Sequence, residues 1–156
     1  MTLPSLEARI AAATGPDREI DAALWLMCFE PTCAHFNVTF HTEQYDNYIS
    51  REYIECDLGT MAVDQMEPPL FRYSESIDAI VALVERSGWR IYTLDASIAG
   101  RWSWMLKSRA QRLRPSSLDD TIMVMGNDYA SSFAPTPALA LCLALVRAEM
   151  AKEEAK

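Results

Sequence analysis

The segment from residue 134 to residue 146 constrains the fold more than any other part of the chain. It reads Ala-Pro-Thr-Pro-Ala-Leu-Ala-Leu-Cys-Leu-Ala-Leu-Val and has almost no polar side chains. Thr136 suits the N-cap position because its hydroxyl can accept a hydrogen bond from a backbone N–H one turn later, and Pro137 suits the first helical position. The segment therefore predicts a helix that begins sharply at Pro137.

This helix is predicted to be buried on more than one side. All nine residues from 138 to 146 are apolar, and charged residues return only from Arg147 onward. A helix that is apolar all round is covered by other elements on several faces, and a bilayer-spanning helix needs roughly 20 residues. We expect one face to lie on a sheet, while Leu141 and Leu145 meet other helices.

Length and composition indicate one folded domain over residues 1–156. Half of the residues are hydrophobic, and 156 residues are enough for one real core. The N-terminal residues lack a basic start followed by an apolar run, so we expect a cytoplasmic protein with no membrane segment. In that setting the four cysteines are interpreted as free thiols: Cys28, Cys33, Cys56 and Cys142.

A helical hairpin is predicted at the N-terminus. Apolar residues at helical spacing predict a helix over Ser5–Thr14, ended by Gly15 in the left-handed geometry that glycine favours. A second helix is predicted to begin at Pro16 and Asp17 and to end near Pro31, with acidic residues in its first turns.

The second half of the chain is predicted to have the order α-β-β-β-α. Its first helix is capped by Ser74 and closed at Gly88, and the buried helix from Pro137 is its last. Strands are predicted at residues 89–95, 102–107 and 121–127. The sequence thus predicts an α+β fold in which helices cover a small antiparallel sheet of at least three strands.

The same order occurs in double-stranded RNA-binding domains, which bind phosphates through lysines at the start of the last helix. This chain has Ala-Pro-Thr-Pro-Ala-Leu there, without a basic residue, so we do not expect RNA binding in that mode.

Residues 31–70 are the least regular stretch and are interpreted as an insertion or variable region within the domain. Alternation of apolar and polar residues around Val38 favours a strand. Residues 43–55 mix both periods and are expected to be helical, while residues 58–69 are expected to form a loop or a short strand that ends at a proline pair.

Charge is distributed unevenly along the chain. The net charge is −8, and residues 43–78 hold nine acidic residues and two arginines, whereas residues 86–114 hold seven basic residues and one aspartate. Overall acidity makes nucleic acid an unlikely main partner, since affinity for it comes largely from neutralising phosphates. Two poles of opposite charge would orient a protein partner, or allow self-association into a homo-oligomer.

The acidic, tyrosine-rich part of residues 31–70 is the main candidate for a partner-binding surface. Tyrosine is favoured in protein interfaces, and an array of carboxylates complements a cationic surface. A solvated acidic face is the simpler interpretation. The candidate residues are Tyr45, Asp46, Tyr48, Glu52, Tyr53, Glu55 and Asp57.

Cysteine and histidine side chains near residue 30 suggest a second possibility, a small zinc-binding module or enzyme. Cys28, Cys33, His35 and His41 are suitable ligand types, but their spacing matches no standard zinc motif. Nothing nearby would stabilise a thiolate at Cys33 for nucleophilic catalysis. We therefore predict no catalytic residue, metal or cofactor, and the glycines form no phosphate-binding loop.

A third possibility is binding of single-stranded nucleic acid through residues 101–114. Trp102 and Trp104 lie among basic residues and could stack on bases, although alternation places both on one face, where a core role is expected. Asp119 and Asp120 could bind a metal, but a turn before a strand is the more common use of such a pair.

Three segments together resemble a known family. They are Leu6–Leu24, Tyr73–Leu83 with Gly88-Trp89, and Ala134–Ala148, and they are similar to the small proteins of the phage alpha-beta-alpha sandwich domain family of proteobacterial phages and prophages. The resemblance covers about half of the chain. It implies phage origin and helices on both sides of a sheet, and it transfers no catalytic residue because the family has no assigned activity.

These observations favour a non-enzymatic phage or prophage accessory protein that binds a host or phage protein. In its sharper form, the hypothesis is that the acidic surface occupies and inhibits a cationic, nucleic-acid-binding or defence complex of the host.

Overall fold

The architecture places helices between two small antiparallel sheets. The computed structural model describes residues 2–30, 38–46, 49–57, 59–96, 102–108 and 129–154, with only the backbone for 45, 46, 49, 92–96, 102–108 and 129–133. The elements are α1 (Leu3–Ala12), α2 (Arg18–Phe29), β1 (Thr39–Asp46), β2 (Ile49–Cys56), β3 (Gly59–Ala62), the 3-10 helix η1 (Val63–Gln65), α3 (Ile77–Arg86), β4 (Trp89–Ala96), β5 (Trp102–Ser108), β6 (Tyr129–Ala134) and α4 (Pro137–Glu154).

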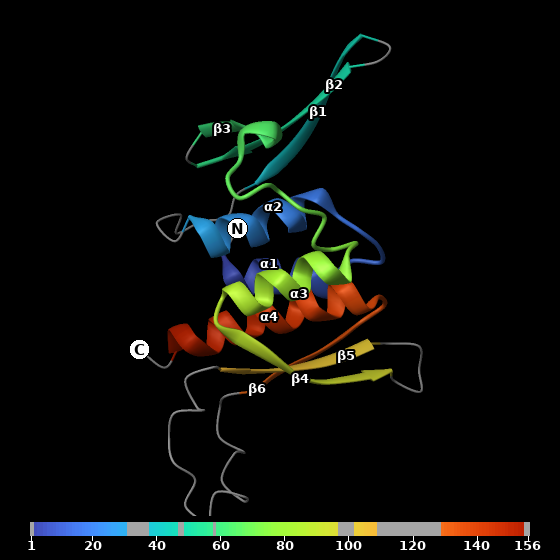
Figure 1. The fold of residues 1–156 in the computed structure, drawn as a ribbon, viewed down its shortest axis with the longest axis vertical. Helices are drawn as coiled ribbons and strands as arrows, with labels where there is room; N and C mark the ends of the chain where they lie inside the picture. Colours follow the sequence, from blue (N-terminus) through green and yellow to red (C-terminus); the bar gives the residue numbers. More distant parts are fainter. Residues whose placement is uncertain are drawn as a thin grey trace, which may run out of the picture.

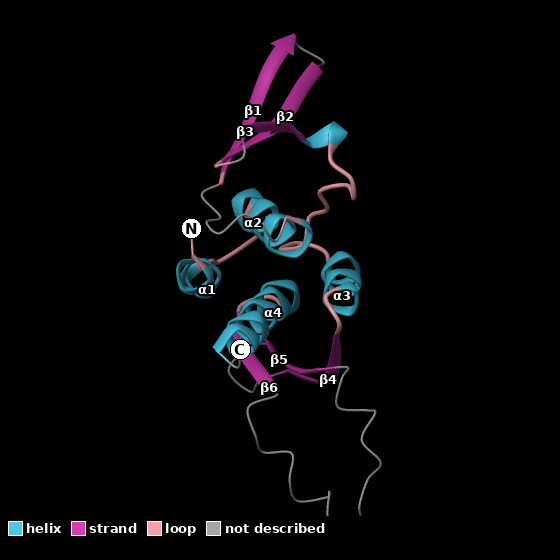
Figure 2. Ribbon diagram, turned by 90° about the vertical axis from the view of Figure 1, so that its left-hand side faces the viewer, coloured by secondary structure: helices cyan, strands magenta, loops and turns pink. Residues whose placement is uncertain are grey.

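Figures 1 and 2 show the sequence of layers. The sheet β1-β2-β3 lies at one end of the molecule beyond α2, and the sheet β4-β5-β6 lies at the other end against α4. The resemblance to the phage family implies helices on both sides of a sheet, whereas the four described α-helices lie between the two sheets. None of these helices is both long and apolar enough to cross a membrane.

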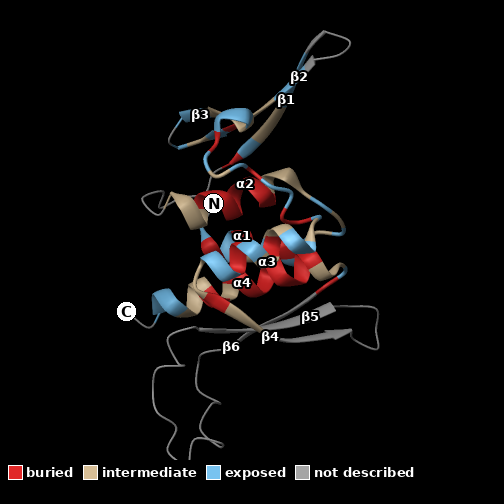
Figure 3. Ribbon diagram, viewed as in Figure 1, coloured by how far each residue is buried: buried red, intermediate tan, exposed pale blue. Residues whose placement is uncertain are grey.

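Helix α4 is the centre of the core, as its sequence predicts. Thr136 Oγ1 accepts a hydrogen bond from the backbone N–H of Leu139 at 3.2 Å, and Pro137 is the first helical residue. Residues 138–146 are all buried, and α4 packs against β5, β6, α1 and α3. The predicted burial between a sheet and other helices is confirmed (Figure 3).

The predicted N-terminal hairpin is present, with different ends. Helix α1 begins at Leu3 after a capping box formed by Thr2 and Ser5. Asp17 caps α2 by accepting from the backbone N–H of Glu19 at 2.9 Å. Gly15 does not have the expected left-handed geometry, because α1 ends earlier, at Ala12, and its extended C-cap Ala13 turns the chain.

The predicted cap of α3 is wrong by two residues. Ser76, not Ser74, accepts the capping hydrogen bond, from the backbone N–H of Ala79 at 3.3 Å. Ser74 is instead buried and bonded to α2. Gly88 ends α3 with a φ of +84°, as predicted, since glycine adopts this geometry without strain.

The sheet that covers α4 confirms the predicted α-β-β-β-α order and the α+β class. Strand β5 is central and pairs antiparallel with both β4 and β6. The third strand was predicted over residues 121–127, which lie outside the described residues, and the sheet uses residues 129–134 instead. Trp89 begins β4 and its indole Nε1 donates to Glu149 of α4 at 2.7 Å, which joins the sheet to the helix.

The predicted helix over residues 43–55 is wrong. These residues form most of β1 and β2, which pair antiparallel with Phe40 opposite Ile54 and His41 opposite Tyr53. Burial alternates along β2, as expected for a strand with one covered face, because Ile54 is fully buried while its neighbours Tyr53 and Glu55 are not. The strand expected around Val38 begins at Thr39, and residues 58–69 include β3 and η1.

Candidate functional site

The hairpin formed by β1 and β2 projects from the rest of the molecule. Strand β3 pairs only with residues 53–56 of β2, so residues 42–46 and 49–52 continue beyond it as a two-stranded ribbon. Figure 1 shows this ribbon pointing away from the helices, and Figure 3 shows that its described side chains are largely exposed. A two-stranded ribbon is only marginally stable by itself, so its base must be held by the rest of the fold.

The two faces of this hairpin have different environments. Phe40, Ile54 and Met61 lie opposite one another on the inner face, where Ile54 is fully buried. Strand alternation places Tyr53 and Glu55 on the outer face, and the Glu55 side chain is 65% exposed. The outer face is therefore the side on which a partner can reach the side chains.

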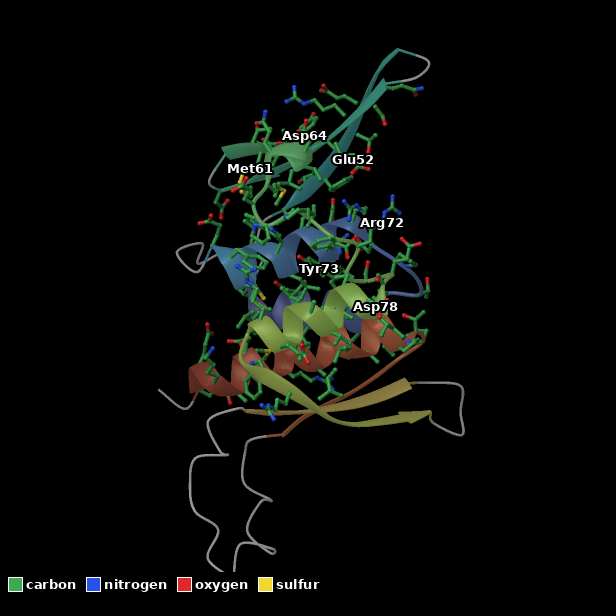
Figure 4. The ribbon with its side chains drawn as sticks, in the orientation of Figure 1. Glu52, Met61, Asp64, Arg72, Tyr73 and Asp78 are labelled. Carbon is green, nitrogen blue, oxygen red and sulfur yellow. The ribbon has the colours of Figure 1, made fainter. Side chains whose placement is uncertain are left out.

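Arg18 in the first turn of α2 anchors the inner face. Its guanidinium lies 4.9 Å from the ring centroid of Phe40 and forms an ion pair with Glu52 at 3.5 Å. It also donates to Asp21 at 2.9 Å and to the carbonyl oxygen of Phe71 at 3.3 Å. One side chain thus connects both strands of the hairpin to α2 and to the chain before α3 (Figure 4 labels Glu52 on β2).

Further polar contacts extend this anchor into the helical layer. Asp17 pairs with Arg9 of α1 at 2.8 Å, and Arg9 also pairs with Glu19. Glu19 accepts a hydrogen bond from the backbone N–H of Phe40 at 3.5 Å. The first turn of α2 therefore contacts α1 on one side and β1 on the other.

Asp21 is the most buried charged residue among those described, with 1% of its surface exposed. It accepts hydrogen bonds from the backbone N–H of Ser74 at 2.6 Å and from Arg18. Desolvation raises the pKa of Asp21, and its bonds to Ser74 and Arg18 oppose that rise. The fully bonded carboxylate is explained as a structural group that holds the segment before α3.

A cluster of side chains lies on the outer face of the hairpin. The rings of His41 and Tyr53 stack with centroids 4.8 Å apart, and the Tyr53 hydroxyl donates to Glu43 at 3.0 Å. His41 Nε2 lies 3.4 Å from a carboxylate oxygen of Glu55. The cluster presents an aromatic surface bordered by two carboxylates, and the exposed Arg51 lies opposite Glu43 on the same face. The two carboxylates outnumber this one arginine, so the face suits a cationic partner.

The structure separates the seven residues that the sequence singles out. Tyr53 and Glu55 share the outer face, and Asp57 is exposed in the turn after β2. Glu52 lies on the inner face, paired with Arg18. For Tyr45 and Asp46 only the strand backbone is described, and Tyr48 lies outside the described residues.

Sequence reasoning did not single out Arg18 or Glu43, and it considered His41 only as a possible zinc ligand. His41 and Glu43 belong to the outer cluster, and Arg18 anchors the inner face. A period-2 interpretation of residues 39–56 would have placed His41 and Glu43 with Tyr53 and Glu55. No local pattern marks Arg18 as an anchor, because only Asp21 is a near neighbour in the chain, while Glu52 and Phe71 are 34 and 53 residues away.

A shallow groove lies between η1 and the end of α3. It has a volume of about 670 Å³ and is lined by Asp64, Gln65, Met66, Glu67, Pro68, Pro69 and Arg86. The Arg86 guanidinium lies 4.7 Å from the ring centroid of Phe29, and Trp25 Nε1 donates to the Pro68 carbonyl at 2.7 Å. Figure 4 shows Asp64 at this level, beside Met61 of β3. The lining mixes both signs of charge and selects no ligand class.

The described side chains do not support the zinc hypothesis. Among them, no group of three His, Cys, Asp or Glu residues lies close enough together to hold a metal ion. Burial raises the pKa of the Cys28 thiol to about 11, and its sulfur lies 3.4 Å from the Ser87 hydroxyl. His41 belongs to the hairpin cluster, while Cys33 and His35 lie outside the described residues.

The predicted nucleic-acid segment is described only in part. Residues 102–108 form the central strand β5, in which Trp102 pairs with the buried Ala134 and Trp104 pairs with Ser132. Arg101, residues 109–114 and the pair Asp119 and Asp120 lie outside the described residues.

No family model, curated protein or solved structure matches this chain.

Proposed function

We propose that this chain is a non-enzymatic accessory protein of a phage or prophage, which acts in the host cytoplasm by binding another protein through the hairpin of β1 and β2. The observation that carries the proposal is the projecting ribbon, whose base is fixed by Arg18 while its outer face stays accessible. A fixed base presents the outer side chains in one geometry, which lowers the entropy that binding costs.

The charge of the hairpin supports a cationic partner. Residues 39–57 contain five acidic residues and one arginine, together with the stacked pair of His41 and Tyr53. Complementary charge speeds encounter and selects partners, and tyrosine supplies contact area at low entropic cost. A nucleic-acid-binding surface of a host defence complex has the matching charge, and its occupation by the hairpin would inhibit it.

The resemblance to the phage family supports the origin in this proposal. The three similar segments correspond to α1 with α2, to α3 with the start of β4, and to α4. Neither the hairpin nor the basic segment after Lys107 is part of them. We assign the activity peculiar to this chain to the hairpin, because its outer face is exposed.

Affinity purification from infected or lysogenic cells tests the proposal. The tagged chain is compared with a hairpin variant, Glu43→Gln/Glu55→Gln/Asp57→Asn, at two salt concentrations. The control variant Glu85→Gln/Glu153→Gln/Glu154→Gln removes the same number of exposed charges from α3 and α4. We expect a partner that the wild type and the control retain and the hairpin variant loses. Equal recovery with all three proteins would overturn the proposal.

A further inference from the structure

The outer edge of β1 is not covered by any strand in the part of the chain that the structure describes. In the sheet order β1-β2-β3, β1 has β2 on one side, and none of the described strands pairs with its other side. An unpaired strand edge presents a row of backbone donors and acceptors that can template an added strand. Natural sheets usually protect such an edge, so it matters which backbone groups of β1 face outward.

The contact between Phe40 and Glu19 identifies which backbone groups face outward. The Phe40 N–H donates to the Glu19 carboxylate and therefore points away from β2. In an antiparallel pair, backbone groups alternate between the partner and the outer edge, so the N–H and C=O of Thr42 and Gln44 also face outward, up to the register shift that follows Gln44. Both residues are exposed, and no hydrogen bond from the described part of the chain satisfies these groups.

We propose that this edge of β1 binds an extended, cationic segment of the partner protein as an added strand, an inference that rests on the proposed function of the hairpin. Thr42 and Gln44 each contribute one backbone donor and one acceptor to the new ladder. Strand addition of this kind takes its affinity from the main chain and its specificity from alternate side chains.

The negative charge beside this edge favours a positively charged segment. A residue opposite Glu43 on an added strand lies about 5 Å from it, close enough for an ion pair. Glu19, where the edge meets α2, already pairs with Arg9 and accepts from the Phe40 N–H, so Glu43 is the carboxylate that the edge presents. Lysine or arginine opposite Glu43 on the added strand would face this carboxylate. A second copy of this chain fits less well, because it would bring five acidic residues and one arginine against an identical set.

Synthetic peptides test the backbone part of the inference. The probe is a fluorescein-labelled decapeptide of alternating lysine and valine, titrated with the full chain and followed by fluorescence anisotropy. Two analogues carry N-methyl groups on the backbone. In one analogue every lysine backbone nitrogen is methylated, and in the other every valine backbone nitrogen is methylated. We expect one analogue to lose about tenfold in affinity and the other to bind like the parent, because only one set of N–H groups faces β1. A decapeptide of alternating glutamate and valine should not bind.

Thr42→Pro tests the same edge from the side of the protein. Proline removes the outward N–H of Thr42 without removing a hydrogen bond to β2, a substitution that edge strands tolerate. We expect about a tenfold loss of peptide affinity for Thr42→Pro and none for the control Thr42→Val, which keeps the N–H. Amide exchange of the Tyr53 N–H, which faces β1 opposite His41, shows whether the hairpin remains paired in each variant. The N-methylated peptides decide the matter if Thr42→Pro does not fold.

The outcomes separate this inference from the proposed function. Equal binding of all lysine peptides, or no binding of the parent peptide, would overturn strand addition, while purification from cells still decides the proposed function. Unchanged peptide affinity in the variant Glu43→Gln/Glu55→Gln/Asp57→Asn would remove the hairpin as the site and would count against both. Dimerisation in light scattering that Thr42→Pro abolishes would make a second copy the occupant and overturn the charge argument.

Discussion

The backbone N–H of Ser74 donates a 2.6 Å hydrogen bond to Oδ1 of Asp21, although 53 positions separate the two residues and both are buried. The Ser74 hydroxyl also accepts from the backbone N–H of Asp17 at 3.0 Å. These bonds join the start of α2 to the segment before α3. Since Arg18 links the same carboxylate to the hairpin, the bond lies where the hairpin, α2 and the segment before α3 meet.

Removing the Asp21 carboxylate is expected to destabilise the fold. Asp21→Ala leaves the buried Ser74 N–H without an acceptor, which costs about 1–3 kcal/mol. Asp21→Asn keeps an acceptor oxygen and should cost less. Urea unfolding at pH 7 measures both free energies, and an alanine variant as stable as the asparagine variant would contradict this role.

The pH dependence of stability provides an independent check on Asp21. Its pKa is raised by desolvation, so the native state holds this proton more tightly than the unfolded chain does. The stability contributed by protonated Asp21 is present below about pH 4 and is lost as the pH rises through the pKa of the folded state. The wild type should therefore lose stability in this window relative to Asp21→Asn. The opposite slope in urea titrations would be evidence of a lowered pKa.

Arg18→Met is expected to loosen the hairpin more than the helical layer. The substitution keeps an apolar side chain over Phe40 but removes the ion pairs to Asp21 and Glu52. Hydrogen exchange should show lower protection in β1 and β2, with α4 nearly unchanged. The control Glu52→Gln should have a small effect, because a half-exposed pair at 3.5 Å contributes about 0–1 kcal/mol. Uniform loss of protection would argue against a local anchor.

Thr136→Ala should destabilise the protein by about 1 kcal/mol, since Thr136 accepts the capping hydrogen bond of α4 from the backbone N–H of Leu139. Thr136→Ser retains the hydroxyl and should be close to the wild type. Thermal and urea unfolding compare the three proteins. A serine variant as unstable as the alanine variant would show that the threonine methyl group, not the cap, matters.

The cysteines should differ in their reactivity towards iodoacetamide. Burial raises the pKa of Cys28 to about 11 and raises that of the fully buried Cys142 well above its ordinary value, so both remain protonated at pH 8. Cys56 is only half-buried and should be labelled first among the three cysteines that the structure describes. Peptide mapping by mass spectrometry at pH 8 follows each residue, with labelling in urea as the control. Early labelling of Cys28 would contradict its burial.

Elements with strong local signals were predicted well. The cap at Thr136, the apolar run of α4 and the glycine that ends α3 each act within one or two turns of chain, so position and burial follow from neighbouring residues. The prediction for residues 43–55 failed because their tyrosines and acidic residues fit both the helical and the strand period. Only pairing between β1 and β2 selects the strand. The cap of α3 was misplaced for a related reason, because the buried bond of Ser74 to Asp21 makes Ser76 the cap.

Local patterns were enough to predict the α+β class, the buried last helix and the acidic character of residues 39–57. Packing in three dimensions turns Glu52 towards α2 and Tyr53 and Glu55 outward, and it leaves Thr42 and Gln44 on an edge that no described strand covers. The two groups of features differ in the range of the interactions behind them. Caps and apolar periods depend on residues a few positions apart, whereas the face and edge of a strand depend on Arg18, Glu19 and Ile54, which only folding brings together.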